Sequence, residues 1–415
     1  MRVLPILLLT VLCSGCIIKD EDETDPAEER QAQADDNVAT VLASGSDRLS
    51  PEELERGRMV MDWREFVERD TTGGRDSAAA AETTEDRSPM SAAGTAGSAA
   101  RNESWDDISA EAVNRGPTAL PVFGDVAGPS VMRVQVLLDR VAFAPGIIDG
   151  RWGRNTEKAV YWLQRREGLR ATGRVDEPTW QRLAQLAGQP AELVRQHRLT
   201  EDDVRGPFVK LPEEPYERRN LDCQCYESLA EKLAERFHTT EDMLRKLNGG
   251  VGLNAVSAGQ TLRVPAVERT AGAAGGDVAR IVVSDGGGYV QALDASGHVL
   301  YHFPATLGSD YSPSPSGDYR ITGIARNPSW HYQPALLEKV PDDEPEAVLP
   351  PGPNNAVGTV WMQLSKEHYG IHGTSAPETI GYTTSNGCVR LTNWDAGFLS
   401  QHVRANTPVA FRDIR

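Results

Sequence analysis

Residues 17–127 limit what this chain can fold into, because the segment is too poor in apolar side chains to form a core. It is rich in Ala, Gly, Ser, Thr, Asp and Glu, a composition that cannot offset the conformational entropy of the chain. It holds about 26 acidic and about 11 basic side chains, so most of the formal net charge of −17 lies there. We predict a disordered acidic tether, with one short helix over residues 51–69 and folded domains downstream.

The charge balance excludes one class of partner. A chain with a net charge of −17 repels a large polyanion, so we expect no nucleic-acid partner.

Residues 1–16 have the pattern of an export signal. Arg2 supplies positive charge, residues 3–12 form a short apolar run, and two small residues precede Cys16. This pattern resembles the lipobox of bacterial lipoproteins, although Cys13 stands where that family usually has Leu. The resemblance implies a lipid on Cys16 and, because Ile17 rather than Asp follows, a periplasmic protein anchored in the outer membrane. An ordinary secretory signal cut nearby is the alternative.

Residues 128–188 have the pattern of a small three-helix domain. Val131, Val134 and Leu138 are spaced for one amphipathic helix, residues 156–166 form a second, and Asp176 begins a third. The order of loop and helix residues from Ile148 to Asp176 resembles the peptidoglycan-binding helical domain of bacterial cell-wall enzymes. The resemblance implies contact with murein, and a helical bundle without a glycan function is the alternative.

Residues 219–267 are predicted to form a βααβ domain. Leu229, Leu233 and Phe237 have helical spacing, and Thr261–Val264 is typical of a strand. The stretch Gly259–Pro265 resembles the end of a LysM domain, which binds N-acetylglucosamine chains. Its usual Gly-Asp-Thr-Leu opening is replaced by Cys-Tyr-Glu-Ser-Leu at residues 225–229, so the resemblance implies the fold more firmly than sugar binding.

Pairing of the cysteines downstream of the export signal would leave one free thiol, whose role needs an explanation. Cys223 and Cys225 could close a disulfide, and Cys388 then remains as a thiol in an exported protein. Cys223, Cys225 and His238 could alternatively bind a metal, but a fourth ligand at zinc spacing is missing. We expect no metal and no organic cofactor.

Residues 278–415 are predicted to form a mostly antiparallel, β-sandwich-like domain, after a Gly-Ala linker at residues 270–276. Short strand-like runs alternate there with Gly, Pro and Asp clusters. The predicted strands are residues 280–284, 289–293, 299–303, 319–324, 359–364 and 407–411. The whole chain is therefore predicted to be a multidomain α+β protein.

Two motifs in this last domain carry the chemistry. His372 lies in Gly370–Thr374, and Cys388 lies in Thr384–Leu391. A cysteine is a strong nucleophile only as a thiolate, so it needs a neighbouring base or positive charge, and His372 and Arg390 are the candidates. A buried cysteine beside a structural histidine is the alternative. The N–H groups of Gly387 and Cys388 could hold an oxyanion, which would complete an acyl-transfer site.

The two motifs resemble the paired signature of L,D-transpeptidases of the YkuD type. Further similar phrases lie at Ser314–Gly317, Asn327–Trp330, Gly352–Asn355 and Thr392–Asp395. Asn386 departs from many members, which have histidine there, and this places the general-base role on His372.

The resemblance implies a thioester mechanism. Cys388 would attack the carbonyl of the third stem-peptide residue, D-alanine would leave, and an amine from another stem peptide or from a lipoprotein lysine would resolve the acyl-enzyme. His372 would move the proton with its ring oriented by the Gly373 carbonyl, and Arg390 would brace the loop or hold a carboxylate. We expect the substrate to contact Ser385, Asn386, Tyr369 and Trp330, with His331 and His368 as weaker candidates.

Two other functions fit the same pattern. An enzyme with water as acceptor would be a carboxypeptidase or hydrolase, and a non-catalytic scaffold would bind peptidoglycan through its wall-binding domains alone. His372 and Cys388 argue against the scaffold, whereas no residue separates amine from water as acceptor.

Overall fold

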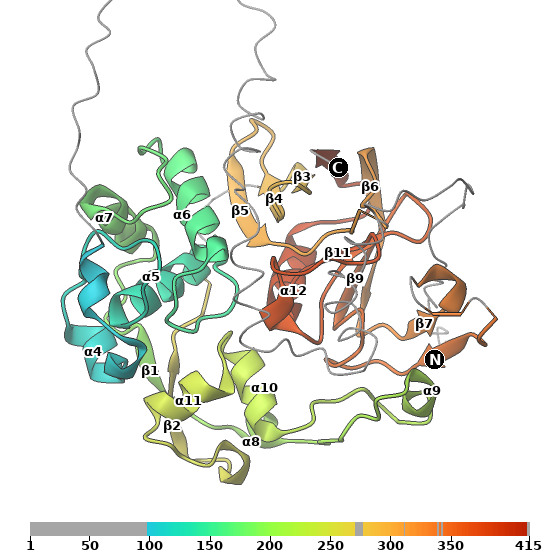
Figure 1. Ribbon diagram of the computed structural model, residues 1–415, viewed down its shortest axis with the longest axis horizontal. Helices are drawn as coiled ribbons and strands as arrows, with labels where there is room; N and C mark the ends of the chain where they lie inside the picture. Colours follow the sequence, from blue (N-terminus) through green and yellow to red (C-terminus); the bar gives the residue numbers. More distant parts are fainter. Residues whose placement is uncertain (1–97, 270–276, 311, 338–339, 342, 413–415) are drawn as a thin grey trace, which may run out of the picture.

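The computed structural model describes residues 98–269, 277–310, 312–337, 340–341 and 343–412 (Figure 1). The expected lipidation site at Cys16, the predicted helix at residues 51–69 and the linker at residues 270–276 lie outside the described residues. Within that described part, no helix combines the length and the apolar character needed to cross a bilayer.

The predicted tether ends earlier than residue 127, because residues 98–127 are folded. They form short 3-10 turns at Ala99–Asn102 and Trp105–Asp107 and helix α4 at Ala110–Arg115. Ile108, Val113 and Val122 are buried in the core of the helical unit that follows. These few apolar residues are spread through a polar sequence, so average composition alone conceals them.

The predicted three-helix domain is confirmed as a structure. Its helices are α5 (Pro129–Arg140), α6 (Arg154–Arg166) and α7 (Glu177–Leu186). Asp176 caps α7, since its carboxylate accepts a hydrogen bond from the backbone N–H of Thr179. The core contains the apolar faces of all three helices. We call residues 98–188 the helical unit.

The βααβ unit begins before residue 219. Its first strand is β1 (Val194–Arg198), which pairs antiparallel with β2 (Thr261–Pro265). Between them lie α8 (Glu201–Val204), α10 (Leu229–Arg236), α11 (Glu241–Leu247) and a 3-10 turn at Leu253–Ala255. A long insertion separates β1 from α10. Because of it, the predicted boundary at residue 219 lies after the true first strand.

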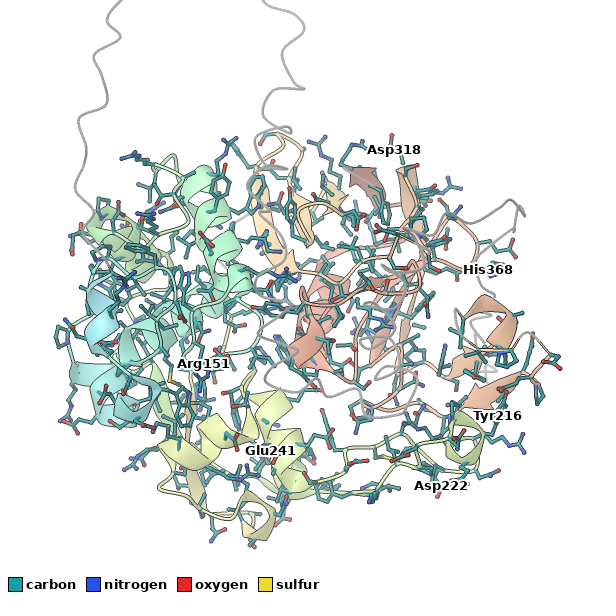
Figure 2. All side chains as sticks on the ribbon, viewed as in Figure 1. Arg151, Tyr216, Asp222, Glu241, Asp318 and His368 are labelled. Atoms are coloured by element: carbon teal, nitrogen blue, oxygen red, sulfur yellow. A yellow bond between two sulfur atoms is a disulfide. The ribbon has the colours of Figure 1, made fainter. Side chains whose placement is uncertain are left out.

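This insertion, residues 205–226, forms an extended strap along the β-rich unit at residues 277–412 (Figure 1), which we call the catalytic unit because it contains the two motifs predicted to carry the chemistry. The strap carries the short helix α9 (Pro215–Arg218), where Tyr216 packs edge-on against Tyr332. Tyr216 and Asp222 mark its course in Figure 2. On the return path of the chain, Cys223 and Cys225 form a disulfide, which the sequence had left open. The buried Gln224 between them hydrogen-bonds to Pro350 and Pro351 of the catalytic unit.

The catalytic unit is a single curled sheet of eight strands, rather than a two-sheet sandwich. The strand order is β11-β10-β9-β6-β12-β3-β4-β5, and the pairs β10–β11 and β12–β3 are parallel while the other neighbours are antiparallel. The strands are β3 (Arg280–Ser284), β4 (Tyr289–Leu293), β5 (Val299–Pro304), β6 (Gly317–Arg326), β9 (Val360–Leu364), β10 (Gly370–His372), β11 (Val389–Arg390) and β12 (Pro408–Arg412).

All six predicted strands are present in this sheet, with ends that differ by up to two residues. Helix α12 (Asn393–His402) packs its Ala396 and Leu399 into the core formed by the sheet. A separate hairpin of β7 (Trp330–Tyr332) and β8 (Ala347–Leu349), with a 3-10 turn at Pro334–Leu336, lies next to α9 (Figure 1). Another 3-10 turn, Pro377–Thr379, lies between the two motifs.

Several polar contacts join the helical unit to the catalytic unit, whereas Met243 and Leu247 of the βααβ unit are buried in the core of the helical unit. On α6, Asn155 donates to the carbonyl of Ile380 at 2.8 Å, and the buried Lys158 donates to the carbonyl of Gly287 at 2.9 Å. The loop at residues 142–144 hydrogen-bonds with His302 on β5, which covers the edge of the sheet. The wall-binding candidates are thus docked on the catalytic unit.

Candidate active site

The two motifs meet at one end of the curled sheet. His372 ends β10, Cys388 immediately precedes β11, and the two strands run parallel with Ile371 opposite Val389 and His372 opposite Arg390. The pairing of two very short strands therefore places the histidine and the thiol on neighbouring backbones. Neither strand was predicted, because runs of two and three residues carry no measurable alternation.

His372 is held in one tautomer by the backbone. Its Nδ1 lies 2.7 Å from the carbonyl oxygen of Gly373. A carbonyl can only accept, so the neutral ring carries its proton on Nδ1 and leaves a lone pair on Nε2. The imidazole also stacks on Trp361, with ring centroids 5.3 Å apart. The ring is therefore oriented from two sides, and Nε2 is the nitrogen able to take a proton.

The surroundings of His372 keep the imidazole neutral. The side chain is buried, and burial together with the nearby positive charge of Arg390 lowers the pKa of His372 to about 3, against a weaker opposing effect of the Gly373 carbonyl. The imidazole is therefore neutral at physiological pH, and its unprotonated Nε2 can accept a proton. Arg390 itself is fixed through its backbone, which exchanges hydrogen bonds with Thr306 at 2.9 and 3.0 Å.

Cys388 lies in a tight turn that is closed by its neighbours. The thiol is half-buried, and its Sγ lies 3.7 Å from the carbonyl oxygen of His368. The hydroxyl of Ser385 donates to the carbonyl of Cys388 at 2.5 Å. Gly387 has a φ of +96°, and a Cβ there would lie 3.1 Å from the ring of Tyr369. Glycine is required at this position both for the backbone conformation and for the space.

The loop between β5 and β6 supports this turn. The buried hydroxyl of Ser314 donates to the carbonyl of Gly387 at 3.1 Å and accepts from the N–H of Gly308. Ser385 is tied by its own backbone to Leu307 and Ser309. The role of Ser314 was not predicted, although the stretch Ser314–Gly317 had been singled out by its resemblance.

The predicted substrate contacts fall into two groups. Ser385, Asn386 and Tyr369 lie in or against the thiol-bearing turn. Trp330 belongs instead to the β7–β8 hairpin, where it packs edge-on against Tyr332, and His331 lies beside it. His368 is next to the thiol through its carbonyl group, and Figure 2 shows its place on the catalytic unit. The structure thus brings three of the four predicted residues to the motif.

The three residues of the metal alternative that we set aside have other partners. Cys223 and Cys225 are joined to each other, and His238 contacts the buried carboxylate of Asp139 at 3.1 Å. His238 also stacks on Trp394 of α12. These three residues therefore link the βααβ unit to its neighbours.

A neutral, oriented imidazole on the strand paired with the one that follows a cysteine turn is the arrangement expected of a cysteine enzyme of the acyl-transfer type. The comparisons agree with this class. Residues 279–410 match the family model of the L,D-transpeptidase catalytic domain (YkuD), and residues 127–183 match that of a "Putative peptidoglycan binding domain".

Individual relatives give the same result. A Bacillus licheniformis protein named "Putative L,D-transpeptidase YkuD" is 30% identical over 182 residues, which are 43% of this chain and 91% of that protein. The "Probable L,D-transpeptidase YbiS" of Escherichia coli K12 is 45% identical over 67 residues, or 16% of this chain and 22% of that protein. The present chain belongs to the YkuD family of L,D-transpeptidases.

Solved structures are more distant. An L,D-transpeptidase from Xylanimonas cellulosilytica matches with 15% identity and a TM-score of 0.31, over 71% of this chain and 98% of that one.

Proposed function

We propose that this L,D-transpeptidase acts on peptidoglycan stem peptides through a thioester on Cys388. The observation that carries the proposal is the fixed tautomer of His372, whose Nδ1–H is held by Gly373 while Nε2 remains able to accept a proton. Strand pairing brings this base to the backbone next to the cysteine turn. A thiol needs such a base, because at its ordinary pKa only a few per cent is thiolate at neutral pH.

The proposed reaction has two steps. The Cys388 sulfur attacks the carbonyl carbon of the third stem residue, and His372 accepts the thiol proton. The carbon–nitrogen bond to D-alanine breaks, and His372 returns the proton to the leaving amine. An acceptor amine then attacks the thioester, gives up its proton to His372 and releases the thiol. The N–H groups of Gly387 and Cys388 are the proposed oxyanion donors, and Arg390 braces the turn.

The acceptor distinguishes two versions of this function. An amine from a second stem peptide or from a lipoprotein lysine gives cross-linking or lipoprotein attachment, whereas water gives a carboxypeptidase. The leaderless chain, residues 17–415, should be incubated with disaccharide tetrapeptide and its products identified by mass. A cross-linked dimer supports the transpeptidase, and disaccharide tripeptide alone supports the hydrolase. Products formed equally by Cys388→Ala would contradict both.

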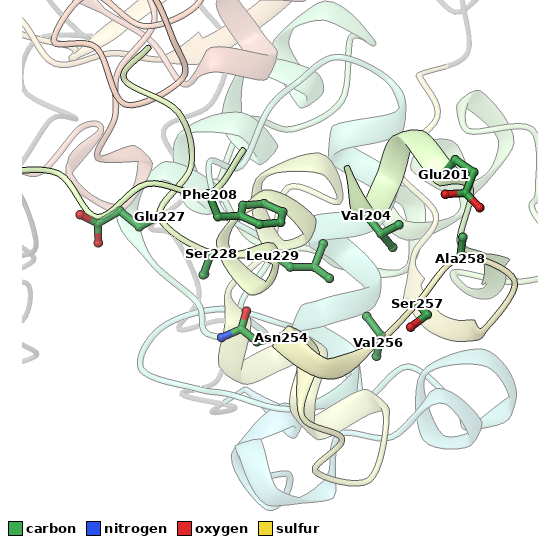
Figure 3. A pocket seen from close by; sticks show the side chains of 10 residues that line it. All are labelled: Glu201, Val204, Phe208, Glu227, Ser228, Leu229, Asn254, Val256, Ser257 and Ala258. Atoms are coloured by element: carbon green, nitrogen blue, oxygen red, sulfur yellow. The ribbon is translucent and has the colours of Figure 1, made fainter. Parts of the chain in front are cut away.

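The helical and βααβ units are proposed to hold glycan strands near the site. The βααβ unit has an open groove of about 640 Å³ between the start of α10 and the loop at residues 254–258 (Figure 3). Phe208, which is 37% exposed, and Asn254 offer it an apolar face and an amide. Insoluble sacculi should retain the Cys388→Ala chain. If the protein stays in the supernatant, the wall-binding proposal fails.

Lipidation at Cys16 is the last part of the proposal. The predicted tether would place a lipid-anchored enzyme within reach of the wall from the outer membrane. Full-length protein should fractionate with outer membranes, whereas Cys16→Ala protein should not. Equal fractionation and processing of the two proteins would contradict lipidation.

A further inference from the structure

A carboxylate of the βααβ unit lies against the catalytic unit. Glu235, near the end of α10, has its oxygens 3.2 and 3.3 Å from the side-chain nitrogen of Asn393, the first residue of α12. The hydroxyl of Tyr226 donates to the same carboxylate at 2.7 Å. Glu235 therefore accepts hydrogen bonds from the strap and from the segment that follows the cysteine motif.

The side-chain oxygen of Asn393 lies against Gly373, the residue that follows His372. Its Oδ1 accepts from the backbone N–H of Thr359 at 3.0 Å. A Cβ added to either Gly358 or Gly373 would overlap this oxygen. The amide of Asn393 therefore fills the space that two glycines leave open, and Gly373 is in direct contact with it.

Gly373 connects this contact to the base. Its N–H donates to Val360 at 3.1 Å, and its carbonyl oxygen receives the Nδ1–H of His372 at 2.7 Å. The orientation of the Gly373 peptide therefore sets the orientation of the imidazole. A continuous set of contacts runs from Glu235 through Asn393 and Gly373 to His372.

The amide orientation of Asn393 depends on having an acceptor at Glu235. With Oδ1 directed at the Thr359 N–H, the –NH2 group points at Glu235 and at the carbonyl of Pro353, 3.2 Å away. Removing the carboxylate would leave one N–H of a buried amide without its acceptor. Rotation of the amide would not relieve this, because –NH2 would then face the Thr359 N–H and Oδ1 would face the Pro353 carbonyl.

We propose that Glu235 is a positioning residue of the transpeptidase, which fixes His372 through Asn393 and the Gly373 peptide. The proposal rests on the proposed role of His372 as the base. It makes the βααβ unit part of the catalytic framework, because a residue of that unit determines the geometry of the base. The groups that face the carboxylate are Tyr226, Asn393 and, at longer range, Glu231.

The ionisation of this carboxyl gives the proposal a distinct readout. Burial raises the pKa of Glu235 to about 7, opposed by the hydrogen bonds from Tyr226 and Asn393 and reinforced by the charge of Glu231. The carboxylate form accepts from both partners. The acid form carries a proton on one oxygen, which faces a donor. We therefore expect kcat to fall as the pH drops through about 7.

The test compares Glu235→Ala, Glu235→Gln and Asn393→Ala with the control Asp242→Asn, an exposed carboxylate on α11. Full leaderless protein is assayed with disaccharide tetrapeptide, and thermal unfolding shows that each variant is folded. We expect Glu235→Ala and Asn393→Ala to lower kcat about ten- to a hundredfold with little change in KM, because the base is misplaced while the substrate site is kept. The control should match the wild type.

Two further readouts separate positioning from a merely structural role. Glu235→Gln cannot ionise and, like the acid form, carries a donor in place of one carboxylate oxygen, so its kcat should stay near the low-pH level of the wild type and lose the pH dependence near 7. The double variant Glu235→Ala/Asn393→Ala should be no slower than Asn393→Ala alone, because both act through one contact. A folded Glu235→Ala protein with wild-type kcat and pH profile, or additive losses in the double variant, would overturn the proposal. A wild-type enzyme without turnover would instead refute the proposed function.

Discussion

His372 and Arg390 are paired across the parallel register of β10 and β11, so a base and a fixed positive charge are neighbours in the site. Together with burial, the charge of Arg390 lowers the pKa of His372 to about 3. The lowered pKa means that the imidazole is neutral at every pH above about 3. The imidazole of the resting enzyme is consequently neutral at physiological pH, with Nε2 able to accept a proton.

The first prediction concerns this pKa. We expect the His372 ring signals to show no titration between pH 5 and pH 8 by NMR, and Arg390→Gln to raise the pKa while burial keeps it below the usual 6.5. The exposed Arg404→Gln serves as the control and should have no effect. A wild-type titration near 6.5 would show that the ring is solvated and that the burial argument is wrong.

The second prediction concerns the nucleophile. Cys388→Ala should abolish peptide exchange, and His372→Ala should lower the rate by about 10²- to 10⁴-fold, because only the minor thiolate population then reacts. Both variants should retain the wild-type melting temperature within a few degrees. Alkylation by iodoacetamide followed by peptide mapping should modify Cys388, since Cys223 and Cys225 are joined in a disulfide. Turnover by Cys388→Ala would identify another nucleophile.

The sequence predicted the parts of this site that lie close together along the chain. Cys388, Gly387 and Arg390 form one motif, and the structure adds that Gly387 has a φ of +96°. The orienting role of the Gly373 carbonyl could also be expected, because it adjoins His372. Strands of five residues, such as β3 and β4, could also be predicted, because apolar runs bounded by turn residues indicate them.

Contacts between distant segments could not be predicted in this way. Glu235 and Asn393 are 158 residues apart, and neither residue type is unusual in its local sequence. The strap separates β1 from α10 in the sequence. The predicted boundary of the βααβ unit at residue 219 therefore left out its first strand. Trp330 was expected at the substrate site from its motif alone; it belongs to the β7–β8 hairpin, and its contact with substrate stays a prediction.

The third prediction concerns the contact between the strap and the catalytic unit. Gly352 has a φ of +150°, and a Cβ there would overlap the backbone carbonyl of Gln224. We expect Gly352→Ala to destabilise the protein by about 1 to 3 kcal/mol, through overpacking and backbone strain. Thermal unfolding measures the effect, and faster hydrogen exchange at residues 223–226 would show that the strap is displaced.

A matched substitution controls for the loss of glycine itself. Gly397 lies inside α12 and has no heavy atom within 4 Å of an added Cβ. Gly397→Ala should therefore stabilise the protein by about 1 kcal/mol through helix propensity. If both variants shift the melting temperature in the same direction, the strap contact does not explain the effect at Gly352.

The fourth prediction concerns the junction of the helical and catalytic units. Arg269 binds Asp139 of α5 at 3.0 Å and also pairs with Asp395 of α12, and both carboxylates are fully buried. Arg269→Met would leave two buried carboxylates without their shared cation, which costs about 3 to 5 kcal/mol when such a pair is broken. The triple variant Asp139→Asn/Arg269→Met/Asp395→Asn removes all three charges and should recover part of that loss.

The control Arg115→Ala breaks an ion pair with Glu111 whose side chains are 79% and 75% exposed, so it should cost less than about 0.5 kcal/mol. Urea unfolding of the four proteins measures these differences. Equal stability of Arg269→Met and the wild type would show that the buried network does not hold the two units together.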